Sequence, residues 1–138
     1  MTERHMSEMV RNRRPLTIPP ATTVADACKQ MFDRRVGAVL VTDSEDGLVG
    51  IFTGRDAVRM LAQGTAANCS VQEVMTRDPC AMAPGSTAIE ALRLMEDGGF
   101  RHVPVVDGGR VVGVVSWGDF RDSEHDRLET EVGLWERI

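Results

Sequence analysis

The chain has 138 residues, 42% of them hydrophobic, and a net charge of −5 at pH 7. Its length allows a core without disulfide staples, and no apolar run is long enough to span a membrane or to act as a secretory signal. Three cysteines without Cys-x-x-Cys spacing predict neither a disulfide framework nor a zinc site. The acidic balance argues against nucleic acid as the main partner. We therefore expect a cytoplasmic protein with no metal and no membrane contact.

The first half of the chain predicts a strand, a helix, two strands and a second helix. Residues 16–18 form a short extended piece, and residues 38–41 and 48–52 form apolar strands around an acidic-glycine turn. Between them, Val24, Ala27, Cys28 and Met31 follow helical spacing. Residues 55–62 predict the second helix. Thr22 or Thr23 supplies the cap oxygen of the first helix, and Ser86 or Thr87 supplies it for the equivalent helix of the second half.

The second half repeats the first. When the sequence is aligned with itself at a displacement of 64 positions, Pro15 aligns with Pro79 and Met31 with Met95. After the strand turn the displacement is 63, and Asp56 aligns with Asp119. This internal repeat predicts the same elements at residues 80–82, 88–95, 103–106 and 110–115. Continuous apolar strands imply burial on both faces of the sheet, so we expect each copy to be covered by the other copy. We place the copies at residues 1–65, including an N-terminal arm, and 66–122.

Residues 123–138 form a C-terminal helical tail outside the repeat. Ser123 and Asp126 resemble a capping box, and Leu128, Val132 and Trp135 form an apolar stripe on an otherwise charged segment. We expect this helix to pack on the module or on a second subunit.

Three short segments resemble the landmarks of CBS domains, which occur in tandem as a Bateman module. They are residues 74–79 (Val-Met-Thr-Arg-Asp-Pro), 101–107 (Arg-His-Val-Pro-Val-Val-Asp) and 50–56 (Gly-Ile-Phe-Thr-Gly-Arg-Asp). The resemblance implies an α/β fold (α+β in some schemes) of two β-α-β-β-α repeats, packed about a pseudo-twofold axis with two clefts. It also implies regulatory binding of AMP, ADP, ATP or S-adenosylmethionine, modulation of an unidentified partner protein, and a homodimer.

A hydroxyl and a carboxylate lie three residues apart at the same point of each copy: Thr53 with Asp56, and Ser116 with Asp119. An ionised aspartate can accept hydrogen bonds from both ribose hydroxyls, and a helix N-terminus favours a phosphate. The same spacing is also a near capping box, which would satisfy the helix without any ligand.

The two candidate sites are expected to differ. Trp117 and Gly118 replace Gly54 and Arg55, so the second copy lacks a basic side chain beside the phosphate. Trp117 stacks on a base or covers the surface. The family implies base contacts from the first strand and the strand edge opposite it. The base candidates are Thr17, Ile18, Ala38 and Val39 in the first copy and Ala81 and Pro104 in the second, and Arg101 and His102 are candidates for phosphate contact.

No catalytic constellation or P-loop is present, so we expect no enzyme. The sequence favours a module that senses an adenosine nucleotide; the alternative is a ligand-free homodimeric interaction scaffold. A homodimer is also expected because several apolar residues lack partners within their repeat, namely Met60, Leu61, Leu128, Val132 and Trp135.

Overall fold

A computed structural model describes residues 3–136, with side chains up to residue 130. The chain divides into two compact units. The first-repeat unit contains residues 14–80 and 108–111, and the second-repeat unit contains residues 3–13, 81–107 and 112–136.

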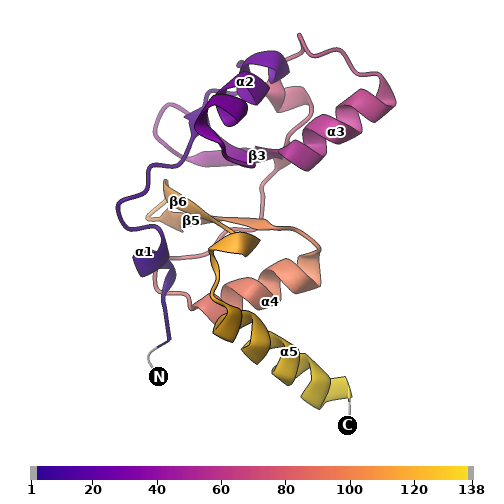
Figure 1. Cartoon of the computed structure of the whole chain (residues 1–138). Helices are drawn as coiled ribbons and strands as arrows, with labels where there is room; N and C mark the ends of the chain where they lie inside the picture. Colours follow the sequence, from indigo (N-terminus) through magenta and orange to yellow (C-terminus); the bar gives the residue numbers. More distant parts are fainter. Residues whose placement is uncertain (1–2, 137–138) are drawn as a thin grey trace. The chain divides into compact units, whose positions relative to one another are not determined.

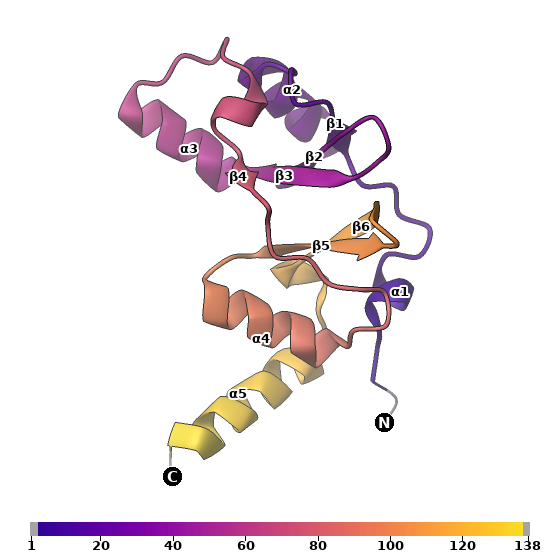
Figure 2. The same cartoon turned by 180° about the vertical axis from the view of Figure 1, so that it is seen from behind.

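The first-repeat unit is a four-stranded sheet with helices on one face (Figure 2). Its order is β1-β2-β3-β4, with β1 parallel to β2 and the other pairs antiparallel. Alternate β2 side chains, Val39 and Val41, enter the core with Phe52 and the helix residues Ala27 and Met60. The elements are β1 (Thr17–Ile18), α2 (Val24–Arg34), β2 (Ala38–Thr42), β3 (Leu48–Thr53), α3 (Gly54–Gln63), η1 (Val71–Glu73) and β4 (Thr76–Arg77).

The second-repeat unit is built on strands β5 and β6 and the helices α4 and α5 (Figure 1). Strands β5 and β6 form a two-stranded sheet, and the strand expected at residues 80–82 is reduced to one parallel bridge between Met82 and Val105. Helix α4 packs on β5 and on α5. The elements are α1 (Met6–Met9), α4 (Ala88–Gly98), β5 (His102–Asp107), β6 (Arg110–Ser116), η2 (Trp117–Asp119) and α5 (Asp122–Glu136).

The first helix of each copy begins at the second of the two predicted caps. The Thr23 hydroxyl accepts the Asp26 amide at 3.2 Å, and the Thr87 hydroxyl accepts the Glu90 amide at 3.4 Å. Each side-chain oxygen satisfies one of the amides that has no partner in the first turn. The predicted helices and their capping residue type are therefore confirmed in both copies.

The N-terminal segment belongs to the second-repeat unit, not to the first. His5 pairs with Thr87, and the Met6 amide donates to the Ser86 carbonyl at 2.8 Å. Met6 is fully buried in the core beside α4. The placement of this segment with the copy at residues 1–65 does not match these contacts.

Residues 66–80 make the reciprocal contacts in the first-repeat unit. Ser70 pairs with Thr23, and the Val71 amide donates to the Thr22 carbonyl at 2.7 Å. Val71 is fully buried in that core. Each unit therefore contains a one-turn helix that comes, in the sequence, just before the first strand of the other copy. For this reason the sequence boundary at residue 65 differs from the boundary of the compact units.

Helix α5 begins at Asp122 and packs against α4, so it is docked on its own unit. The expected capping box at Ser123 is wrong, because the Arg121 amide donates to the Glu124 carboxylate at 2.7 Å and fixes the helix start earlier. Leu128 is 5% exposed in the core. Met60 is likewise buried, so neither residue is an exposed interface candidate. The side chains of Val132 and Trp135 lie outside the described residues.

Candidate functional site

The Thr53–Asp56 pair lies at the junction of β3 and α3, where it forms a complete capping box. One Asp56 oxygen, Oδ2, accepts the Thr53 amide at 2.8 Å and the Thr53 hydroxyl at 3.1 Å. The other oxygen, Oδ1, lies 3.0 Å from Arg59 Nη2. Asp56 is 6% exposed. The helix cap that competed with the ligand hypothesis is therefore present, and it holds the carboxylate in one orientation.

This cap leaves acceptor and donor capacity for a ligand. A carboxylate has about four lone-pair positions, and the described contacts of Asp56 use three of them. In the first turn of α3, the Gly54 amide donates to Gly37 and the Asp56 amide to Thr53. The Arg55 amide at this helix N-terminus is the remaining donor that can face an anion.

Register places the first-copy base candidates beside this pair. Ala38 is the antiparallel partner of Thr53, and Val39 follows it on β2. Ile18 lies on β1, parallel to β2. The Ile18 and Val39 side chains belong to the unit's core, whereas Thr17 is exposed. Of these four residues, Thr17 is thus the one whose side chain is accessible, and the others would contribute mainly backbone groups.

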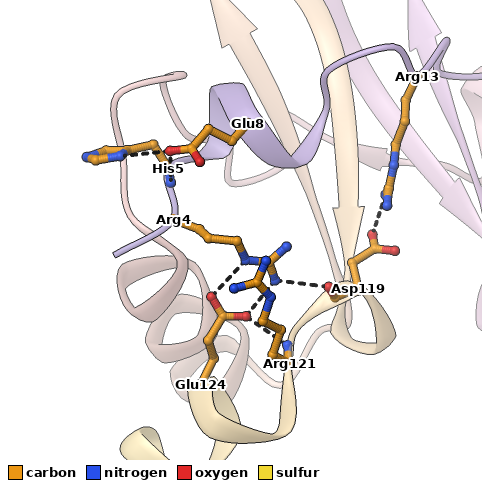
Figure 3. Close-up of polar contacts among 7 residues, drawn as sticks. All are labelled: Arg4, His5, Glu8, Arg13, Asp119, Arg121 and Glu124. Atoms are coloured by element: carbon orange, nitrogen blue, oxygen red, sulfur yellow. Dashed lines mark hydrogen bonds and ion pairs between the residues drawn. The ribbon is translucent and has the colours of Figure 1, made fainter. Parts of the chain in front are cut away.

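The second copy repeats the junction with a different set of contacts. Ser116 and Asp119 also form a capping box, in which the Ser116 amide donates to Asp119 Oδ2 at 2.8 Å. Arg13 Nη1 lies 3.0 Å from the same oxygen (Figure 3). The helix that follows Thr53 in the first copy is replaced by the 3₁₀ turn η2, and α5 starts only at Asp122. The expected difference between the two candidate sites is therefore present in their backbone as well.

Trp117 is engaged by two neighbouring side chains. The Arg101 guanidinium lies over its ring, 5.5 Å from the centroid, and the His125 ring is 4.7 Å away. Sequence patterns do not reveal the contact with His125, because nothing local links it to a residue eight positions upstream. These contacts favour the surface-covering role of Trp117 over base stacking, and they direct Arg101 to an aromatic ring.

The other second-copy candidates cluster around β5. The Met82 amide donates to the Pro104 carbonyl at 3.0 Å, which places Ala81 next to this strand. His102 begins β5, and burial lowers its pKa while the charge of Asp119 partly opposes that shift. A neutral imidazole at pH 7 is a poorer phosphate partner than a charged one. Among the described residues, no group of three or more His, Cys, Asp or Glu side chains is placed to hold a metal.

Two copies of one α/β unit, each with a hydroxyl–carboxylate pair at the same junction, define a tandem-repeat protein with a duplicated candidate site. The chain belongs to the CBS domain family, which matches it twice, over residues 7–63 and 71–126. None of the helices described in residues 3–136 is long and apolar enough to cross a membrane.

Relatives of known name and structure agree with this assignment. A CBS domain-containing protein of Arabidopsis thaliana is 46% identical over 108 residues, which cover 77% of this chain and 19% of that protein. The chain thus spans about a fifth of that relative's length. A CBS domain protein of Pyrobaculum aerophilum complexed with AMP is 25% identical, with a TM-score of 0.83, covering 92% of this chain and 99% of that one.

The CBS domain pair of the protein MJ0100 has been solved with 5′-methylthioadenosine and S-adenosyl-L-methionine. It is 26% identical, with a TM-score of 0.75, and covers 83% of this chain and 94% of that chain. Adenosine compounds are therefore the ligands named for two solved relatives, and none of the relatives named here carries the name of an enzyme.

Proposed function

We propose that this protein is a regulatory module that senses an adenosine nucleotide of the AMP, ADP or ATP type and modulates a partner protein, without catalysis. The observation that carries the proposal is the Asp56 carboxylate, which is buried and fixed at the β3–α3 junction with acceptor capacity to spare. The AMP complex of a CBS relative supports an adenosine nucleotide as the ligand class, and S-adenosylmethionine remains a second candidate.

The junction offers both kinds of contact that a nucleotide needs. A ribose hydroxyl would donate to Asp56 Oδ1, which accepts only Arg59 among the described residues. A phosphate would face the Arg55 amide and the positive end of the ten-residue helix α3. The exposed Arg55 side chain adds a positive charge close by. The fold supplies these groups without a metal ligand.

Regulation requires that the ligand prefer one arrangement of the protein over another. A ligand shifts a conformational equilibrium only by its difference in affinity for the two states. The partner protein would bind the favoured state. The strength of regulation is therefore limited by the difference in ligand affinity between the two states and not by the total affinity.

Thermal unfolding with AMP tests the proposal. AMP at about one hundred times its dissociation constant should add about 2.7 kcal/mol to the free energy of unfolding. Asp56→Asn should remove most of this gain, because asparagine keeps one cap acceptor but loses the charge. Asp107→Asn, at the exposed end of β5, is the matched control and should respond like the wild type. A wild-type protein whose unfolding is unaffected by millimolar AMP would refute nucleotide sensing.

One observation favours the second candidate function, a homodimeric scaffold. Three large apolar side chains on α2 and α3 are exposed: Phe32 by 83%, Leu61 by 81% and Val58 by 66%. These helices contact each other within the first-repeat unit. Large exposed apolar side chains on neighbouring helices favour an interaction site, so we propose self-association through α2 and α3 in addition to nucleotide sensing.

A further inference from the structure

Two arginines of the N-terminal segment contact Asp119, the candidate ribose-binding carboxylate of the second copy. Arg13 Nη1 lies 3.0 Å from Oδ2, and Arg4 Nη2 donates to the Asp119 carbonyl oxygen at 3.3 Å (Figure 3). Oδ2 also accepts the Ser116 amide at 2.8 Å. This oxygen is therefore occupied by a nearby backbone donor, the Ser116 amide, and by a cation from a distant part of the sequence, Arg13.

The segment that carries Arg13 is held firmly by apolar packing. Met6, Met9 and Val10 are 0%, 4% and 7% exposed in the core of the second-repeat unit. Val10 packs so closely on Gly113 that a Cβ at Gly113 would lie 2.5 Å from the Val10 Cβ. Arg13 follows three residues later, so its backbone is already placed, and the ion pair with Asp119 requires only side-chain ordering.

The first copy has a different arrangement. Its carboxylate, Asp56, pairs with Arg59, which lies one turn further along the same helix and uses the other oxygen, Oδ1. No described segment outside the β3–α3 junction supplies a cation to Asp56. Only the second copy thus links its candidate ligand carboxylate to a separate part of the chain.

We propose that Arg13 is a built-in competitor of the nucleotide for Asp119. This inference rests on the proposed function, because it assumes that the second-copy carboxylate can also hold a ribose. A ribose that donates to both carboxylate oxygens must take the position held by Arg13. Nucleotide binding at the second copy is then weaker than it would be without the Arg13–Asp119 pair, and it releases Arg13.

The size of the effect follows from solvent exposure. The Arg13 side chain is 51% exposed and that of Asp119 is 23% exposed, so water and salt screen the pair. Exposed ion pairs contribute little, and removing this one should tighten second-copy binding by up to about fivefold.

Isothermal titration with AMP and with adenosine tests the inference in an Asp56→Asn background, which isolates the second copy. Arg13→Gln should tighten the binding of both compounds, and Asp119→Asn should abolish it. Arg11→Gln is the matched control, since it removes one charge from the same exposed stretch but leaves the Arg13–Asp119 pair intact. Adenosine lacks a phosphate, so it separates competition at the carboxylate from attraction of the phosphate to Arg13.

The outcomes separate this inference from the proposed function. Tighter binding of both probes in Arg13→Gln, with no change in Arg11→Gln, supports the competitor. Weaker AMP binding in Arg13→Gln, or the absence of any binding that depends on Asp119, overturns the competitor inference. Nucleotide sensing is still upheld in that case if binding to the wild type depends on Asp56. Binding that depends on Asp119 but not on Asp56, and that tightens in Arg13→Gln, would uphold the competitor and refute the assignment of Asp56. Failure of every variant to bind either probe refutes both.

Discussion

Arg4 and Glu124 lie 120 positions apart in sequence and are joined by two hydrogen bonds, from Nε to Oε2 at 3.1 Å and from Nη2 to Oε1 at 2.6 Å. Burial acts to raise the pKa of Glu124, but the hydrogen bonds from Arg4 and from the Arg121 amide, together with both arginine charges, lower it overall. The pair therefore fixes the start of α5 to the N-terminal segment.

We predict that Glu124→Gln lowers the free energy of unfolding at pH 7 by about 1–3 kcal/mol, because a charged hydrogen-bond acceptor is lost. A lowered folded-state pKa stabilises the protein above the unfolded-state value, near 4.5, and this contribution is lost as the pH falls through the folded-state pKa. The difference between variant and wild type should therefore shrink in acid. Urea unfolding at several pH values measures it, and equal losses in the exposed control Glu129→Gln would contradict the assignment.

The pKa of the His102 imidazole should lie below the ordinary histidine value of 6.5, because burial disfavours the charged ring. The unfolded chain then binds this proton more readily, so stability should fall as the pH drops from about 6.5 through the folded-state pKa. Asp119 opposes the shift, and Asp119→Asn should lower the pKa further. An NMR titration of the ring checks both statements, and a wild-type midpoint at or above 6.5 would contradict them.

Two equivalent glycines should differ in their tolerance of alanine. A Cβ at Gly113 would meet the branched Val10 side chain, whereas a Cβ at Gly50 would meet the flexible Met75 thioether. We predict that Gly113→Ala costs about 1–3 kcal/mol and that Gly50→Ala costs less. Gly54→Ala faces open space at the start of α3 and should be nearly neutral. Chemical denaturation of the three variants gives the order, and an equal cost at Gly50 and Gly113 would contradict the packing argument.

Much of the fold follows from local sequence patterns. Helical spacing around Met31 and its repeat at Met95 predict α2 and α4, because each stripe needs only residues within one helix. The capping boxes at Asp56 and Asp119 are also local. The contact of His125 with Trp117 was not predicted, because it depends on how α5 docks.

The packing of the N-terminal segment against the second copy was also not predicted, although residues 7–9 (Ser-Glu-Met) are similar to residues 72–74 (Gln-Glu-Val). Matching sequences identify equivalent elements but do not indicate which copy each element packs against. His5 pairs with Thr87 through main-chain contacts, which leave no side-chain pattern for the sequence to reveal. The Arg13–Asp119 ion pair depends on the same placement.

The homodimer proposed above predicts a solution mass of twice the 15.1 kDa chain. Leu61→Asp should weaken association, because it places a charge in an apolar contact, while Gln63→Asp at the exposed end of the same helix should leave it unchanged. Light scattering across the micromolar range measures both effects. A wild-type mass near that of one chain would exclude the dimer.

The reciprocal placement of α1 and η1 has a consequence for how this chain arose. A single ancestral copy would carry its one-turn helix upstream of its own first strand, where only another copy could use it. Such an ancestor would have folded as a domain-swapped pair of identical chains. Gene duplication would join such partners into one polypeptide and let each copy change independently. Equivalent positions now differ, with Gly54 facing Trp117 and Arg55 facing Gly118, and the two carboxylates Asp56 and Asp119 have different cation partners, Arg59 and Arg13.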